Sequence, residues 1–277
     1  MNRAILITGA SSGIGFATSL AAARSGLQVY AGVRNERDAQ RLAQHRGITP
    51  VIIDVTQPPT LAGAASRIER DGITLAGVVC NAGVALGGPA ESVPLDEWRQ
   101  TFEVNCIGAI ATLQAMLPLL RKSPSRIVLV GSVSGRVGFP YIAPYSASKF
   151  ALRAIADALR VELAPAQIDV TLIEPGSVKT PIWAKGRAMS DVLRSRLTPQ
   201  MPEYYADAVE SLVDGLAAEE RSGMPVERVA DSIVRVFFER RPRARRMLGA
   251  AAQAASFIGL LPARLRDRVL RSVMRLP

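Results

Sequence analysis

The sequence predicts an α/β protein with one doubly wound parallel sheet of about seven strands and helices on both faces. Short apolar runs rich in β-branched residues recur along the chain, as expected for strands that are covered on both faces. Segments of helical periodicity lie between them, and this alternation is typical of parallel sheets with right-handed crossovers. The 277 residues, 48% of them hydrophobic, contain no internal repeat or low-complexity linker. We therefore expect a single domain over residues 1–277.

Strands and helices alternate from the first residues onward. The expected strands occupy residues 4–8, 27–33, 49–54, 75–80, 126–131 and 169–174, with a seventh strand at 245–248. Helical periodicity is clearest over residues 14–25, 95–121, 147–164 and 250–261. The pattern loosens after residue 175, where a stretch rich in Ser, Met, Pro and Tyr predicts a substrate loop or lid over residues 181–225. Residues 239–277 form a basic C-terminal extension.

Positive charge is concentrated in this extension. The formal net charge is +10, and residues 239–277 contain ten arginines and two acids. No recognition motif or interleaved aromatic side chains accompany the charge, so we do not expect a nucleic-acid partner. After Pro262 one helix face carries Leu265, Val269, Val273 and Leu276, and the opposite face carries Arg264, Arg268, Arg271 and Arg275. Such a helix either packs on its own subunit or makes a peripheral contact with anionic membrane lipid.

Residues able to bind a metal or form a disulfide are few. Cys80 and Cys106 lie in apolar surroundings and form no CxxC pair, and His45, the single histidine, has no Cys or second His nearby. We expect no metal site and a reducing compartment. The first strand begins three residues into the chain, which predicts no signal peptide, and the apolar run at 247–262 is shorter than the ~20 residues of a membrane span. These observations predict a cytoplasmic protein.

A glycine-rich turn joins the first strand to the first helix, with the sequence TGASSGIG over residues 8–15. Glycines let the backbone approach a pyrophosphate, whose charge the helix N-terminus stabilises. Such turns also simply connect strands to helices, but the place of this one after the first strand favours a Rossmann-type dinucleotide site. The candidate cofactor-binding residues here are Gly9, Ser11, Ser12, Gly13, Ile14 and Gly15.

The end of the second strand indicates which dinucleotide binds. Arg34 and Asn35 follow this strand. In such folds an acid at this place binds the ribose 2′-hydroxyl, whereas a basic group accommodates a 2′-phosphate. Arg34 therefore favours NADP(H), with NAD(H) as the second choice. The alternative is a solvated arginine in a charged turn.

The third and fourth strands add further candidates at the same edge of the sheet. Asp54 and Val55 follow the third strand, where Asp54 either accepts a hydrogen bond from the adenine amino group or caps the next turn. Asn81, Ala82 and Gly83 follow the fourth strand. Ligands of doubly wound folds bind at this carboxyl edge.

Tyr145 and Lys149 are the candidates for proton transfer. They lie four residues apart on one face of an expected helix. A nearby cation favours the phenolate, so we expect Lys149 to lower the pKa of Tyr145, which can then exchange a proton with a carbonyl or alcohol oxygen. Ser132 closes the fifth strand and is placed to hold that oxygen. Asn105 is an amide within an apolar helix, which indicates a water relay or a local helix distortion. Each residue alone also fits an ordinary helix or strand end.

In combination, these motifs resemble the short-chain dehydrogenase/reductase family. The resemblance covers residues 3–182 and includes Pro175-Gly176 beside the motifs already described. It implies that Tyr145 is the catalytic acid/base and that Lys149 also binds the nicotinamide ribose. It likewise implies that Ser132 positions the carbonyl and that Asn105 anchors a water in a proton relay. The residues expected to line the nicotinamide are Pro175, Gly176, Val178 and Thr180.

Within the family, residues 29–34 and 174–183 and the long C-terminal region resemble the steroid and retinol dehydrogenase-like branch. Two positions depart from the common pattern. Ser12 stands where many NADP-dependent members have a second basic residue, so Arg34 carries the cofactor preference unaided. Cys80 replaces an asparagine, which we expect to leave the chemistry unchanged.

The resulting expectation is an NADP(H)-preferring oxidoreductase that interconverts an alcohol and a ketone or aldehyde by hydride transfer. Apolar side chains within residues 181–225, among them Trp183 and Tyr204, predict a lipophilic substrate, or else they merely cover the domain. A catalytically silent NADP-binding regulatory protein is the alternative, and the complete set of Asn105, Ser132, Tyr145 and Lys149 argues against it. We expect a homo-oligomer.

Overall fold

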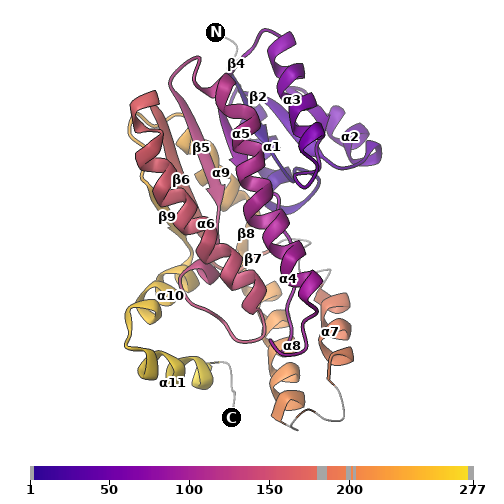
Figure 1. The fold of residues 1–277 in the computed structure, drawn as a ribbon, viewed down its shortest axis with the longest axis vertical. Coiled ribbons are helices and arrows are strands. Elements are labelled where there is room, and N and C mark those ends of the chain that lie inside the picture. The colour runs from indigo at the N-terminus through magenta and orange to yellow at the C-terminus, as the bar shows by residue number, and fades with distance from the viewer. Residues whose placement is uncertain (1–2, 180–185, 198–200, 202–203, 274–277) are drawn as a thin grey trace.

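A seven-stranded parallel sheet forms the centre of the computed structural model, which describes residues 3–179, 186–197, 201 and 204–273 (Figure 1). The strand order is β3-β2-β1-β4-β5-β6-β9, so the chain winds outward from β1 in both directions. The strands are β1 (Arg3–Ile7), β2 (Gln28–Val33), β3 (Ile48–Ile52), β4 (Thr74–Cys80), β5 (Ser125–Val130), β6 (Ile168–Pro175) and β9 (Arg245–Leu248). The predicted fold class is confirmed, and the seventh strand lies at the predicted residues.

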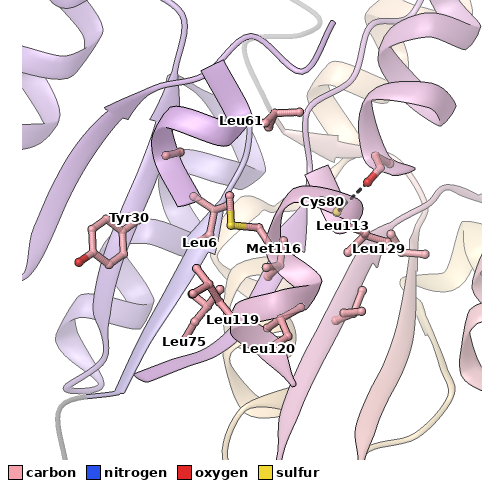
Figure 2. Packing of buried hydrophobic residues seen from close by; sticks show 14 of the residues in the cluster. Leu6, Tyr30, Leu61, Leu75, Cys80, Leu113, Met116, Leu119, Leu120 and Leu129 are labelled. Carbon is pink, nitrogen blue, oxygen red and sulfur yellow. Dashed lines mark hydrogen bonds between the residues drawn. The ribbon is translucent and has the colours of Figure 1, made fainter. Parts of the chain in front are cut away.

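Each face of the sheet carries its own apolar core, because the strands are hydrophobic on both sides. The helices α3 (Pro58–Arg70), α5 (Gly108–Leu120) and α6 (Ala143–Glu162) cover one face. Figure 2 shows Met116 and Leu120 of α5 packed near Leu6 and Leu75 of the strands. The other face is covered by α1 (Gly13–Arg24), α2 (Glu36–Ala43) and α9 (Val226–Val236). This double covering explains the continuous apolar strands of the sequence.

One long helix contains a π-helical turn at its middle. It comprises α4 (Leu95–Phe102), the π-helical residues Glu103–Ile107 and α5. Asn105 lies in the π-helical turn, so the predicted local distortion is confirmed. Among the described residues, Leu95–Leu120 is the one helix long and apolar enough to cross a membrane. An 18-residue window of it has a mean hydropathy of 1.4, and half of that window is buried inside the protein. Its buried face packs on the sheet, as expected of a core helix.

The described parts of residues 181–225 are mainly helical. They form α7 (Gly186–Ser195), α8 (Tyr204–Ser222) and the short strand β8 (Met224–Pro225), which pairs with β7 (Val178–Lys179). The expectation of a loop was therefore wrong for these residues, because the Ser residues of this stretch lie within the two helices. A role as a substrate lid stays a prediction. Leu193, Ala208 and Val209 are buried and attach the two helices to the domain.

The C-terminal extension is part of the domain. After β9 it forms α10 (Ala250–Leu260) and α11 (Ala263–Val273), and Leu270 of α11 packs with Val137 and Ala255. Leu265, predicted on the packing face, is 46% exposed, whereas Leu270 is 7% exposed. The predicted apolar face was thus wrong at this position, but the helix does pack on its own chain. Leu276 lies outside the described residues, and membrane contact stays a prediction.

Part of the C-terminal charge is paired with acids. Arg245 bonds to Asp157 of α6, and Arg246 bonds to Glu239. The Arg245–Asp157 pair and the pairing of β9 with β6 join the extension to the rest of the domain.

Candidate active site

The glycine turn between β1 and α1 is closely packed against the end of β4. Gly9 has a left-handed backbone with φ 65°, and a Cβ on Gly9 would lie 2.8 Å from the Cα of Ala82. A Cβ on Gly15 would lie 2.3 Å from the carbonyl oxygen of Gly9 and 2.5 Å from Nδ2 of Asn81. No larger residue fits at either position without a shift of the backbone. The turn has the close packing that a pyrophosphate cradle requires.

Side chains at the end of β4 and β1 fix this turn in place. Asn81 Nδ2 donates to the carbonyl oxygens of Thr8 and Gly9 at 3.0 and 3.1 Å. The Thr8 hydroxyl accepts from the backbone N–H groups of Asn81 and Ala82, each at 3.1 Å. At the start of α1 the Ser12 side chain forms no capping hydrogen bond, and the described first turn contains no acid. The N–H groups there fit an anion, so the site fits the diphosphate of a dinucleotide.

The residues after β2 and β3 take local structural roles. Arg34 is exposed. Asn35 is the N-cap of α2, and its Oδ1 accepts from the N–H of Asp38 at 2.9 Å. Asp54 Oδ1 accepts from the N–H and the hydroxyl of Thr56 at 3.0 and 2.7 Å. Burial favours a higher pKa for Asp54, but the Thr56 hydrogen bonds and the charge of Arg34 place that pKa below its usual value. Asp54 therefore does cap the next turn, and its adenine contact stays a prediction.

Asn105 is buried and joins three segments of the site. Its Oδ1 accepts from the N–H of Val84 at 2.8 Å, and its Nδ2 donates to the Val84 carbonyl oxygen and to Oγ of Ser148, each at 2.9 Å. The Ser148 hydroxyl in turn donates to the carbonyl oxygen of Tyr145 at 2.7 Å. This amide lies in the π-helical turn and contacts Ser148 of α6. Asn105 thus connects the segment after Gly83 with the helix that carries Tyr145.

Ser132, Tyr145 and Lys149 meet at the carboxyl end of β5. The Ser132 hydroxyl donates a hydrogen bond to Tyr145 and accepts one from the N–H of Ser134 at 3.1 Å. Lys149 is buried, and its Nζ donates to the Val130 carbonyl oxygen at 2.9 Å and lies 5.5 Å from the ring centre of Tyr145. These three of the four side chains that the sequence proposed for catalysis are therefore neighbours.

The pKa values of this group differ from the expectation. Burial raises the pKa of Tyr145, and the hydrogen bond from Ser132 offsets the rise only in part. Burial also lowers the pKa of Lys149 to about 8, although the neighbouring Cys106 favours its charged form. The predicted lowering of the Tyr145 pKa by Lys149 was wrong, because burial of the phenol raises that pKa and the hydrogen bond of the Lys149 ammonium goes to Val130.

The segment after β6 is held by the C-terminal extension. Pro175 pairs with Leu248 of β9, and the Gly176 N–H donates to the Leu248 carbonyl oxygen at 3.0 Å. A Cβ on Gly176 would lie 3.1 Å from the Cβ of Ala251. Val178 is buried in β7. Thr180 lies outside the described residues.

Several contributors were not recognised in the sequence. Thr8 and Ser148 connect the predicted residues through hydrogen bonds, and Arg136 forms a buried ion pair with Glu174, the residue before Pro175. Hydroxyl and charged residues of these types are too common for a single sequence to single them out. Among the described residues, no cluster of three or more His, Cys, Asp or Glu side chains suits a metal ion.

A cavity of about 540 Å³ lies beside the segment that leads into α6. Tyr141, four residues before Tyr145, is on its wall and has a left-handed backbone with φ 63°. The other lining residues are Gly138, Pro140, Tyr204, Asp267, Leu270 and Arg271. The start of α8 and the helix α11 thus supply part of the wall, so the C-terminal extension contributes to this pocket.

The fold and the glycine turn together define an α/β protein of the dinucleotide-binding class. The family model of short chain dehydrogenases matches residues 3–191, and the chain belongs to this family. It is 33% identical to the NADPH-dependent 3-dehydrocapnine reductase of Ornithobacterium rhinotracheale, over 96% of this chain and 95% of the relative. It is 32% identical to retinol dehydrogenase 5 of Mus musculus, over 99% of this chain and 89% of the relative.

Solved structures agree with this assignment. A short chain dehydrogenase from Burkholderia cenocepacia J2315, determined in complex with NADP, is 25% identical and superposes with a TM-score of 0.74, covering 99% of this chain and 98% of the other. The predicted family and the predicted enzyme class, an oxidoreductase, are confirmed. The resemblance to retinol dehydrogenases is confirmed as well.

Proposed function

We propose that the protein is an NADP(H)-preferring enzyme that interconverts a lipophilic alcohol and the corresponding ketone or aldehyde, with Tyr145 as the acid/base. The observation that carries this proposal is the meeting of Ser132, Tyr145 and Lys149 at the carboxyl end of β5, with Asn105 joined to Tyr145 through Ser148. A bound nicotinamide supplies or accepts the hydride. The protein side chains position the substrate oxygen and move its proton.

Tyr145 acts on the oxygen atom of the substrate. Because its pKa is raised, the phenol is protonated at neutral pH, and this is the form that carbonyl reduction requires. Ser132 donates a hydrogen bond to the phenol and is placed to hold the same substrate oxygen. Lys149, fixed at the Val130 carbonyl, supplies positive charge beside the ring and a donor for the nicotinamide ribose. Asn105 fixes the helix position of Tyr145 through Ser148.

Four observations support the choice of cofactor. The glycine turn fits a diphosphate, and an exposed arginine, Arg34, follows β2 where the adenosine ribose lies in such folds. One relative is named an NADPH-dependent reductase, and a solved structure of similar fold holds NADP. NAD(H) is the second choice.

A lipophilic substrate is supported by the cavity beside the segment that leads into α6, the helix of Tyr145. Tyr141, Tyr204 and Leu270 give it an aromatic and aliphatic wall, although Asp267 and Arg271 add charge at one side. A relative named for retinol oxidation is consistent with such a substrate. Small polar carbonyls would leave much of this wall exposed to water.

The experiment is a panel of alcohols and carbonyls followed by NADPH absorbance, with NADH in parallel. We expect turnover of long-chain, retinoid or steroidal compounds and little turnover of small polar ones. Tyr145→Phe is expected to abolish turnover while NADPH binding, measured by fluorescence, stays unchanged. Turnover that survives Tyr145→Phe contradicts the mechanism. Binding of NADPH without turnover of any compound would instead support a regulatory protein.

A further inference from the structure

Arg41 reaches from the last turn of α2 to the glycine turn. Its guanidinium donates a hydrogen bond to the carbonyl oxygen of Ser11. The side chain is nevertheless 52% exposed, so its remaining donors are open to a ligand. Arg41 was not among the candidate residues of the sequence, because six residues separate it from Arg34 and nothing in the pattern directs it to the turn.

Two neighbours hold the guanidinium in this orientation. It lies over the ring of Phe16, 5.3 Å from the ring centre. The Phe16 ring also makes an edge-to-face contact with the His45 ring, and the two ring centres are 5.9 Å apart. The Asp38 carboxylate is 3.3 Å from the guanidinium and is itself bonded to Asn35. A guanidinium restrained in this way loses little conformational freedom when it binds an anion.

Arg41 and Arg34 flank the same turn. The N–H of Ala10 donates to the Gly32 carbonyl oxygen at 2.9 Å, which ties the glycine turn to the end of β2 just before Arg34. Arg41 is bonded to the next residue of the turn, Ser11, beside the exposed Ser12. Arg34 and Arg41 bring two positive charges to this edge, where Asp38 lies beside Arg41 and Asp54 is within electrostatic range of Arg34. It is the edge at which the adenosine ribose of a bound dinucleotide lies.

We propose that Arg41 is a specificity-determining residue that, together with Arg34, binds the 2′-phosphate of NADP(H). The inference rests on the proposed function. Many NADP-dependent members of the family have a second basic residue in the glycine turn, where this chain has Ser12. In this protein the guanidinium of Arg41, on α2, supplies that second positive charge. A planar fork of N–H donors matches a phosphate group, and hydrogen bonds between two charged groups are the strong ones. Arg34 therefore does not set the cofactor preference unaided.

The test measures binding directly by isothermal titration of the full chain with NADPH, NADH, 2′,5′-ADP and 5′-ADP. Arg41→Gln is expected to weaken binding of NADPH and 2′,5′-ADP by roughly 10- to 100-fold, the loss of one charge-assisted contact, and to leave NADH and 5′-ADP unchanged. Arg41→Lys keeps the charge without the fork and is expected to recover part of the affinity. Arg46→Gln, the same charge change at an exposed arginine just past α2, is the control and should change nothing.

The possible results separate the inference from the proposed function. Equal weakening of NADPH and NADH by Arg41→Gln would show that Arg41 only braces the turn, and unchanged affinities would show that it does not touch the ligand. Either result overturns the inference while the NADP(H) preference stands. A wild-type protein that binds 2′,5′-ADP no more tightly than 5′-ADP overturns both.

Discussion

The ion pair of Arg136 and Glu174, the residue before Pro175, is buried, and removing one partner should strongly destabilise the fold. Nε and Nη2 of Arg136 donate to the two carboxylate oxygens of Glu174 at 2.9 and 2.6 Å. The Glu174 side chain is fully buried and that of Arg136 is 14% exposed. Replacing Arg136 by methionine leaves the carboxylate buried without a partner, which costs about 3–5 kcal/mol. The loss also removes the bond from Arg136 to Ser256 of α10.

Urea unfolding at neutral pH, followed by circular dichroism, measures this cost. Arg194→Met is the matched control, because Arg194 forms a similar two-point pair with Glu210 on the exposed surface and should contribute less than about 1 kcal/mol. The double variant Arg136→Met/Glu174→Met removes both charges and should recover much of the loss. If Arg136→Met costs no more than Arg194→Met, or if the double variant is less stable than Arg136→Met, the reasoning is refuted.

Two further predictions follow from the glycine turn and from Lys149. Gly15→Ala places a Cβ 2.3 Å from a backbone oxygen, so it should cost about 1–3 kcal/mol in urea unfolding and weaken NADPH binding, whereas Gly63→Ala in open space should not destabilise. Burial lowers the pKa of Lys149 from its ordinary 10.5 to about 8, so between these pH values the unfolded chain binds more protons than the folded protein does. The stability of the wild type relative to Lys149→Met should therefore rise from pH 8 to pH 10, and a constant difference would contradict the burial of a charged amine.

Local patterns predicted the sheet well, because each strand is a short apolar run bounded by turn residues. The seventh strand and the following helix were found even inside the basic extension. The helices of residues 186–195 and 204–222 were missed, since their interrupted periodicity resembles that of a loop. Leu270 replaced Leu265 as the buried residue of α11 because packing on Val137 and Ala255, remote in sequence, decides which face is covered.

The sequence predicted which residues form the site, but it predicted their pKa values only in part. The spacing of Tyr145 and Lys149 and the unusual amide of Asn105 were visible in the sequence. The direction of the Tyr145 pKa was not, because it depends on how deeply the fold buries the phenol. Arg41 reaches the glycine turn only through the packing of α2 on Phe16, a contact between separate elements. Pairwise relations of this kind are set by tertiary structure.

The bond between Gly176 and Leu248 has a consequence for the synthesis of the protein. Chains generally begin to fold from the N-terminus as they leave the ribosome. The glycine turn and Tyr145 are made early, but the segment after β6 receives its partner strand only when residues 245–248 have emerged. A nascent chain that has passed Lys149 therefore has Tyr145 beside β5 as the edge strand, and β6 and then β9 are added to that side of the sheet.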